Sequence, residues 1–199
     1  MSGGRTATRN TIARVGLPLV VPATMVVALS CIGGARDLNF GIVVPGVLMR
    51  SAQPSPDDLA RIQAEHGLKT IVNLRTPARI EDDYDCRAEK AFAEAHGITF
   101  VNIPVGTPPS REHITEFLAV MNDPANHPVL VHCAQGQIRA STMCASYGME
   151  RLGWSNEQAL AEQIPYKFEQ SKRNRDAVRH FILAYRPETS HSAQTVSER

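Results

Sequence analysis

The chain has 199 residues, of which 43% are hydrophobic and 21% are charged. This balance is typical of a globular protein with a packed core and excludes an intrinsically disordered chain. The formal net charge of +1 gives no electrostatic reason to expect nucleic acid as a partner. The four cysteines fit neither a zinc site nor a dense disulfide framework, so each is interpreted from its own surroundings.

The N-terminus has the pattern of a targeting segment. Residues 1–14 contain three arginines and no acidic residue, and residues 15–35 carry no charge. A basic region followed by an apolar run is typical of a secretory signal or a membrane anchor, and this run is just long enough to cross a bilayer. The sequence Ala-Leu-Ser-Cys that ends at Cys31 resembles a bacterial lipobox, whose cysteine is lipidated after cleavage.

Residues 1–36 therefore allow four interpretations: a lipoprotein signal, a cleaved signal peptide, an uncleaved anchor, or a mis-assigned start without a targeting role. The first three predict an exported bacterial protein, either periplasmic or membrane-associated. A membrane tether would act through residues 15–35 or through a lipid on Cys31.

Strand and helix signals alternate from residue 37 to residue 187, which we expect to form one domain. Strands are predicted within 41–51, broken by the turn signal Pro45-Gly46, and at 70–74, 98–103 and 128–132; helices are predicted at 55–67, 82–96, from 110, at 138–152 and twice more before residue 187. This alternation predicts an α/β fold with a central, mostly parallel sheet flanked by helices. Residues 188–199 are polar and are expected to form a flexible tail.

The segment 132–139, His-Cys-Ala-Gln-Gly-Gln-Ile-Arg, joins a buried-type strand to a helix. Loops at the carboxyl ends of parallel strands hold active sites, and N–H groups at a helix start bind anions. Cys133 is the predicted nucleophile, and Arg139 presents a planar fork that can bind two phosphate oxygens. The residues predicted to bind phosphate are Ala134, Gln135, Gly136, Gln137, Ile138 and Arg139.

His-Cys followed by five residues and an arginine is the signature of the protein tyrosine and dual-specificity phosphatases, and the chain resembles this family over roughly residues 41–185. The segments 49–54 (MRSAQP) and 70–75 (TIVNLR) resemble the early segments of compact bacterial dual-specificity-like phosphatases. The resemblance implies hydrolysis of phosphomonoesters through a phosphocysteine on Cys133. It also implies that Arg139 and the loop amides bind the transition state, and that no metal ion or other cofactor takes part.

Two positions depart from the pattern of the family. Ala140 stands where a serine or threonine usually helps the thiolate to leave, so we expect slow breakdown of the intermediate. The loop 104–109, where the family usually has an aspartate as general acid, contains no acidic residue. The acid is therefore either absent or supplied from elsewhere. The candidate is Asp82, and the alternatives are Asp83, Asp85 and Glu112.

Other functions and roles stay open at this point. A pseudophosphatase would bind phosphate without efficient turnover, and a rhodanese-type sulfurtransferase would also carry a cysteine loop after a strand. The loop has no lysine, and its two glutamines are neutral donors, which favours a phosphoprotein such as a phosphotyrosine substrate, or a small phosphoester. His132 and Cys144 are interpreted as packed residues. Cys86 is either a semi-buried thiol or a redox partner of Cys133.

Overall fold

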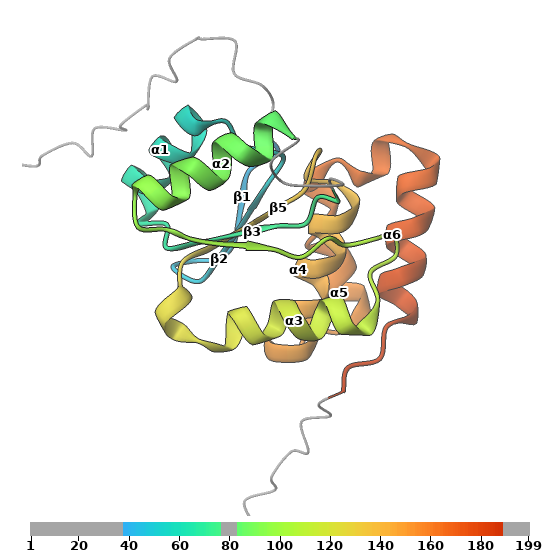
Figure 1. Ribbon diagram of the computed structural model, residues 1–199. Coiled ribbons are helices and arrows are strands. Elements are labelled where there is room, and N and C mark those ends of the chain that lie inside the picture. The colour runs from blue at the N-terminus through green and yellow to red at the C-terminus, as the bar shows by residue number, and fades with distance from the viewer. Residues whose placement is uncertain (1–37, 77–82, 189–199) are drawn as a thin grey trace, which may run out of the picture. The chain divides into compact units, whose positions relative to one another are not determined.

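The computed structural model describes residues 38–76 and 83–188, and these residues form a sheet between two layers of helices (Figure 1). The sheet has five strands in the order β1 (Gly41–Val44), β2 (Leu48–Ser51), β5 (Val129–His132), β3 (Thr70–Asn73) and β4 (Thr99–Asn102). β1 pairs antiparallel with β2, and all the other neighbours are parallel. The predicted α/β fold with a mostly parallel sheet is confirmed.

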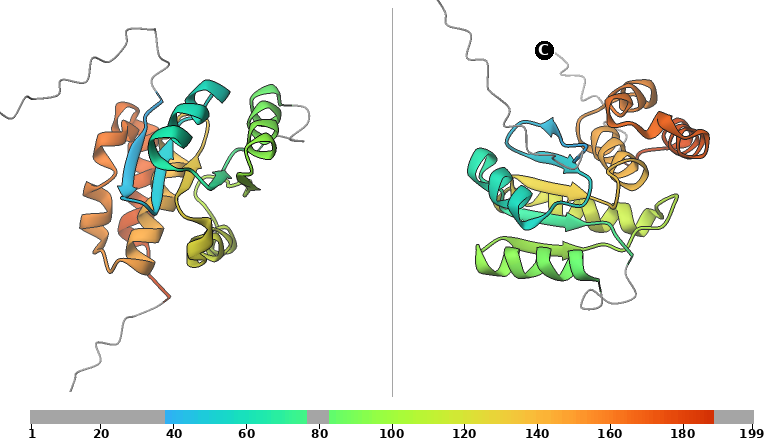
Figure 2. Two further views of the ribbon diagram at one scale, coloured as in Figure 1. Left: turned by 90° about the vertical axis from the view of Figure 1, so that its left-hand side faces the viewer. Right: turned by 90° about the horizontal axis from the view of Figure 1, so that it is seen from above.

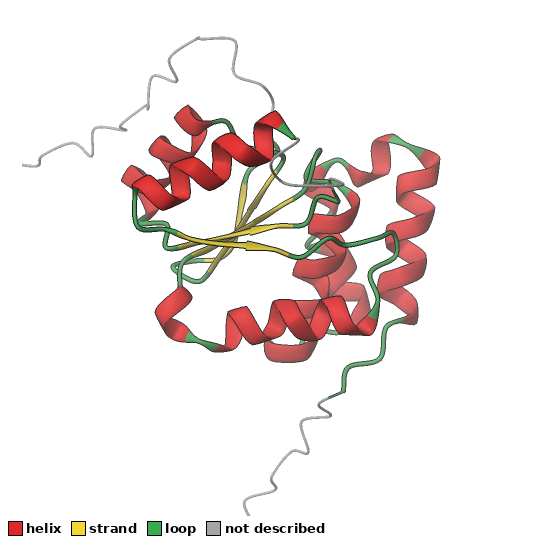
Figure 3. Cartoon of the chain, viewed as in Figure 1, coloured by secondary structure: helices red, strands yellow, loops and turns green. Residues whose placement is uncertain are grey.

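The helices divide between the two faces of the sheet (Figures 1 and 2). One face is covered by α1 (Pro56–His66) and α2 (Tyr84–Ala95), and the other by α3 (Arg111–Asn122), α4 (Ile138–Arg151), α5 (Asn156–Ala161) and α6 (Lys172–Ala184). Short 3-10 turns at Pro124–Asn126, Ile164–Tyr166 and Phe168–Gln170 lie in the connections. Figure 3 shows this alternation of strands, loops and helices along the chain.

Local capping signals place the helix ends where the sequence predicts them. Ser55 begins α1: its hydroxyl accepts from the N–H of Asp58, and the Asp58 carboxylate accepts from the N–H of Ser55. Gly67 ends the same helix in the left-handed conformation, at φ +67°. α2 begins later than expected because Asp83, rather than a residue before it, caps the helix through the N–H of Cys86.

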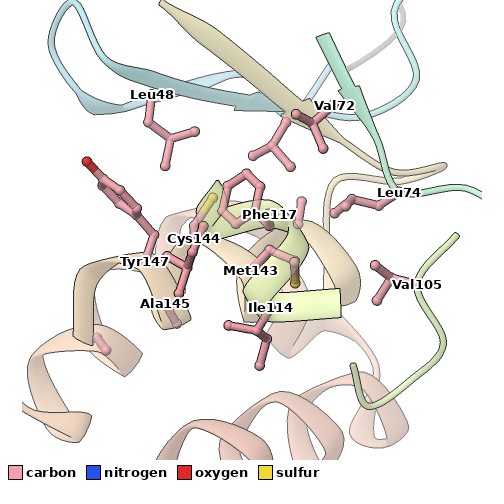
Figure 4. Packing of buried hydrophobic residues seen from close by; sticks show 14 of the residues in the cluster. Leu48, Val72, Leu74, Val105, Ile114, Phe117, Met143, Cys144, Ala145 and Tyr147 are labelled. Carbon is pink, nitrogen blue, oxygen red and sulfur yellow. The ribbon is translucent and has the colours of Figure 1, made fainter. Parts of the chain in front are cut away.

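The core lies on both faces of the sheet because successive side chains of a strand point in opposite directions. Val72 packs in one cluster with Phe117 and Met143, on the face that α3, α4, α5 and α6 cover (Figure 4). Val131 belongs to the same cluster. The other set of side chains, which includes Leu130, packs toward α1 and α2. The central strands are therefore apolar on both faces and hold the loops at their ends on a rigid support.

No helix in the ranges 38–76 and 83–188 is long and apolar enough to cross a bilayer. The targeting segment predicted for residues 1–36 and the tail predicted from residue 189 onward lie outside the described residues, and both stay predictions.

Candidate active site

The carboxyl ends of four parallel strands meet at one edge of the sheet. A pocket of about 300 Å³ lies at this edge and is lined by Thr76 after β3, by residues 105–107 after β4 and by the loop after β5. From that loop, Cys133 and Arg139 both line the pocket. Because the strands run parallel, segments far apart in the sequence converge here, which is where ligands bind in sheets of this kind.

Of the residues predicted to bind phosphate, four line this pocket: Ala134, Gln135, Ile138 and Arg139. Gly136 and Gln137 do not line it. The Gln137 side chain instead accepts a hydrogen bond from the side-chain amide of Asn174 on α6, at 2.9 Å.

The backbone of the loop is held by donors that lie outside it. The carbonyl groups of residues 134–136 accept hydrogen bonds from the N–H of Gln53, the amide side chain of Asn39 and the guanidinium of Arg50. In a trans peptide the C=O and N–H groups point in opposite directions, so each held carbonyl turns the next N–H the other way. In the described part of the chain, the N–H groups of residues 134–140 donate to no protein acceptor. A loop with these donors at a helix start is an anion site.

Gly136 is the residue that lets this loop pack against the end of β2. Its φ is +63°, in the left-handed region that favours glycine. A Cβ atom at this position would lie 2.7 Å from the backbone nitrogen of Ala52 and 2.8 Å from the carbonyl carbon of Ser51. No side chain fits without moving one of the two segments.

Cys133 is nearly buried, with 3% of its surface exposed, and its thiol is free. Cys144 is also free and lies in the core, where burial raises its pKa to about 11, so it is a neutral thiol at physiological pH. Cys86 is a third free thiol; burial raises its pKa, and its sulfur accepts from the Asn73 amide at 3.4 Å. The packed-residue interpretation of Cys144 is confirmed. The redox pairing of Cys86 with Cys133 stays a prediction.

Arg139 lies in the first turn of α4, as the sequence predicts. Its Nη1 donates to the carbonyl oxygen of Leu74 at 2.9 Å, which anchors the guanidinium beside the end of β3. In the described residues this is its one protein partner, so most of its five N–H donors stay available to a ligand. Their planar arrangement suits a bidentate contact with phosphate.

His132 and Glu89 form a fully buried polar pair behind the nucleophile. His132 Nε2 lies 2.8 Å from Glu89 Oε1, and neither side chain is exposed. Glu89 Oε2 accepts from the amide of Asn73 at 2.8 Å. The packed interpretation of His132 is confirmed, whereas sequence reasoning missed Glu89 because glutamates are rarely buried. Its position on one helix face with the buried residues Cys86 and Ala93 was the available signal.

The described acid candidates have other partners. Asp83 Oδ2 lies 2.6 Å from Arg75 Nη2, and the pKa of Asp83 is lowered, mainly by the N–H of Cys86 and also by Arg75. Asp85 lies 3.8 Å from the same guanidinium. The pKa of Glu112 is lowered, chiefly by the Ser110 hydroxyl. A general acid must be protonated before it reacts, so a lowered pKa does not suit Asp83 or Glu112 to that role.

No carboxylate lines the pocket in the described part of the chain. Asp82 lies outside the described residues, and its assignment as general acid stays a prediction. The hydroxyls after Ala140 have structural partners: the Ser141 hydroxyl accepts from Arg50 at 3.1 Å, and Thr142 donates to carbonyls of its own helix.

A mostly parallel sheet that carries a Cys-x5-Arg loop between a central strand and a helix defines a phosphatase of the protein tyrosine and dual-specificity class. Residues 45–180 match the model of the family described as "DSP-PTPase phosphatase fused to NAD+ Kinase", and the chain belongs to this family.

Curated relatives match part of the chain. It is 34% identical over 118 residues to inositol diphosphatase DSP4 of Arabidopsis thaliana, covering 53% of this chain and 52% of that protein. It is 35% identical over 97 residues to probable NAD kinase 2, chloroplastic, of Oryza sativa subsp. japonica, covering 45% of this chain and 10% of that protein. The chain therefore spans about half the length of one relative and a tenth of the other.

Solved structures share the fold. The core catalytic domain of the PP-IP phosphatase SIW14 from S. cerevisiae, in complex with citrate, has a TM-score of 0.62 at 22% identity, covering 74% of this chain and 85% of that one. TpbA of P. aeruginosa, in complex with pTyr, has a TM-score of 0.57 at 23% identity, covering 74% of this chain and 90% of that one.

Proposed function

We propose that this chain hydrolyses phosphomonoesters through a phosphocysteine on Cys133. The observation that carries the proposal is that Cys133 and Arg139 line one pocket, beside a loop whose N–H groups have no protein acceptor among the described residues. In the first step the thiolate attacks phosphorus, the bond to the leaving oxygen breaks, and that oxygen takes up a proton from solvent or from a borrowed acid. In the second step water attacks phosphorus, the S–P bond breaks, the proton of water passes to solvent or to the phosphate, and phosphate and the thiolate are released.

The chain's own groups match the charge of this reaction. The loop amides and the positive end of the α4 dipole lie at the helix start, where they favour a bound anion. Arg139 adds a full charge in a planar fork, which binds the equatorial oxygens of the transferring phosphoryl group. Because these donors are fixed by the fold, they need no reorganisation when charge develops.

The nucleophile is tested by Cys133→Ser, with Cys86→Ala as the matched control. The serine variant should lose hydrolysis of nitrophenyl phosphate but still bind inorganic phosphate, because a hydroxyl keeps the shape without being ionised. The Cys86 variant should keep activity. Near-wild-type turnover by Cys133→Ser would show that another group is the nucleophile. Phosphate binding without turnover by the wild type would identify a pseudophosphatase, and sulfur transfer from thiosulfate to cyanide would identify a rhodanese-type enzyme.

The leaving group narrows the substrate class. A general acid typically contributes ~10²–10⁴-fold to rate, most for leaving oxygens that are strong bases. The described pocket lining holds no carboxylate, so an acid would be borrowed from outside this lining. A weak or borrowed acid favours aryl phosphates and phosphoanhydrides, whose leaving groups depart without strong acid assistance. Phosphotyrosine is an aryl phosphate, and the diphosphate group of an inositol diphosphate is a phosphoanhydride. DSP4 is named an inositol diphosphatase and SIW14 a PP-IP phosphatase, and TpbA was solved in complex with pTyr.

Between these two classes, the charge of the pocket favours phosphotyrosine. Arg139 is the one cation in the described lining, and a multiply phosphorylated inositol carries far more negative charge than it can neutralise. The expected order of hydrolysis rates is tested with a phosphotyrosine peptide, a phosphoserine peptide and inositol diphosphate. Phosphotyrosine should be hydrolysed fastest and phosphoserine slowest. Equal rates on the two peptides would contradict the leaving-group argument, and a preference for inositol diphosphate would contradict the charge argument.

A further inference from the structure

Arg50, on β2 behind the phosphate loop, is a fully buried cation. Its guanidinium donates to the side-chain oxygen of Gln163 at 2.5 Å, to the Ser141 hydroxyl at 3.1 Å and to the carbonyl of Gly136. Its central carbon lies 3.8 Å from the centre of the Tyr166 ring. Every one of these partners is neutral, so no carboxylate contacts the charge within the described residues.

The charge of Arg50 has no counter-ion among its contacts in the described residues, so it produces a positive potential at neighbouring groups. Burial is costly for a charge without a counter-ion, and burial is the main cause that lowers the pKa of Arg50. Arginine nevertheless stays protonated in proteins, so the site carries an uncompensated positive charge. Cys144, Tyr166 and, least of the three, Cys133 act on Arg50 electrostatically and raise its pKa, so its positive potential reaches Cys133. A thiolate at Cys133, or phosphate bound beside it, is the anion that the fold can bring near this charge.

The contact with Gly136 also sets the shape of the loop. Holding this carbonyl on the β2 side turns the N–H of Gln137 to the opposite side of the peptide plane. That N–H has no protein acceptor in the described part of the chain. Arg50 therefore touches the phosphate site through one peptide group, without lining the pocket itself.

We propose that Arg50 is a positioning residue of the phosphate site, which fixes the Gly136 peptide and supplies a buried, unneutralised positive charge that strengthens anion binding beside Cys133. This inference deepens the proposed function and rests on its claim that the loop binds an oxyanion. It does not depend on the phosphocysteine being hydrolysed.

The charge can be cancelled while the packing is kept. Gln163→Glu has almost the same shape and keeps an oxygen against Arg50, but it supplies the missing carboxylate. Gln163→Met removes the oxygen and leaves the charge unneutralised, so it is the matched control. Arg50→Met removes the charge and the contact with Gly136 together.

The readout compares two reagents that alkylate Cys133 in the full chain. Iodoacetate is an anion and iodoacetamide is neutral. The rate with iodoacetate divided by the rate with iodoacetamide therefore reports the electrostatic potential at Cys133. Changes in the access to the thiol or in its thiolate fraction affect both rates equally and cancel in this ratio. This ratio should fall by about tenfold in Arg50→Met, which removes the charge, and in Gln163→Glu, which neutralises it. In Gln163→Met the ratio should stay at the wild-type value. Inorganic phosphate should protect Cys133 about tenfold less well in the same two variants.

The comparison of the two Gln163 variants tests whether the charge of Arg50 strengthens anion binding beside Cys133, even where Arg50→Met does not fold. Equal rate ratios and equal phosphate protection in Gln163→Glu and Gln163→Met would overturn the proposal. A fall confined to Gln163→Glu would support it. If Gln163→Glu shows that fall but the wild type hydrolyses no phosphomonoester, the proposed function fails while the role of Arg50 stands.

Discussion

Replacing Gly136 with alanine tests whether the phosphate loop depends on its contact with β2. The change has two separable effects. A left-handed conformation costs a non-glycine residue about 1–2 kcal/mol. The new Cβ would also lie 2.7 Å from the nitrogen of Ala52, a backbone atom that cannot rotate away, and overpacking of this kind costs about 1–3 kcal/mol. We therefore expect Gly136→Ala to lower the free energy of unfolding by about 2–5 kcal/mol.

Gly46→Ala is the matched control. Gly46 has a φ of +71° in the β1–β2 turn, and a Cβ there would meet nothing within 4 Å. This variant should lose only the conformational part, about 1–2 kcal/mol. The difference between the two variants isolates the contact with β2.

Urea unfolding of both variants gives the two free energies, and protection of Cys133 by inorganic phosphate gives the binding affinity. If the loop moves away instead of bearing strain, Gly136→Ala should lose phosphate affinity while Gly46→Ala keeps it. The reasoning fails if Gly136→Ala matches Gly46→Ala in stability and the wild type in phosphate affinity.

Three further outcomes are expected. Arg139→Lys should lower kcat/KM by roughly 10²-fold, or about 2.7 kcal/mol, because a point charge does not replace a planar fork; near-wild-type kinetics would show that Arg139 does not clamp the phosphoryl group. Asp82→Asn should slow hydrolysis of alkyl phosphates far more than that of nitrophenyl phosphate, and equal effects on both would remove Asp82 as the acid. Full-length protein in a bacterial host should sediment with membranes, while a chain lacking residues 1–36 should be soluble and active; an intact N-terminus in the cytosolic fraction would contradict the targeting prediction.

Local signals in the sequence determined the elements and the centre of the site. Ser55 and Gly67 mark the ends of α1 because capping depends on a few adjacent residues. The loop with Cys133 and Arg139 was equally readable, since the apolar strand before it, the spacing within it and the helix after it are continuous in the chain. These features involve residues that are adjacent in the sequence, so the sequence alone is enough to predict them.

What supports the loop was decided only by the tertiary structure. Asn39, Arg50 and Gln53 hold its carbonyls from across the fold, and Glu89 reaches His132 from a helix on the opposite face of the sheet from α4. In the sequence, a buried arginine on a strand looks the same as an exposed one. Parallel pairing of β2 with β5 places Arg50 and Gln53 beside the loop. Pairing between strands that are distant in the sequence cannot be recognised from the residues next to either strand.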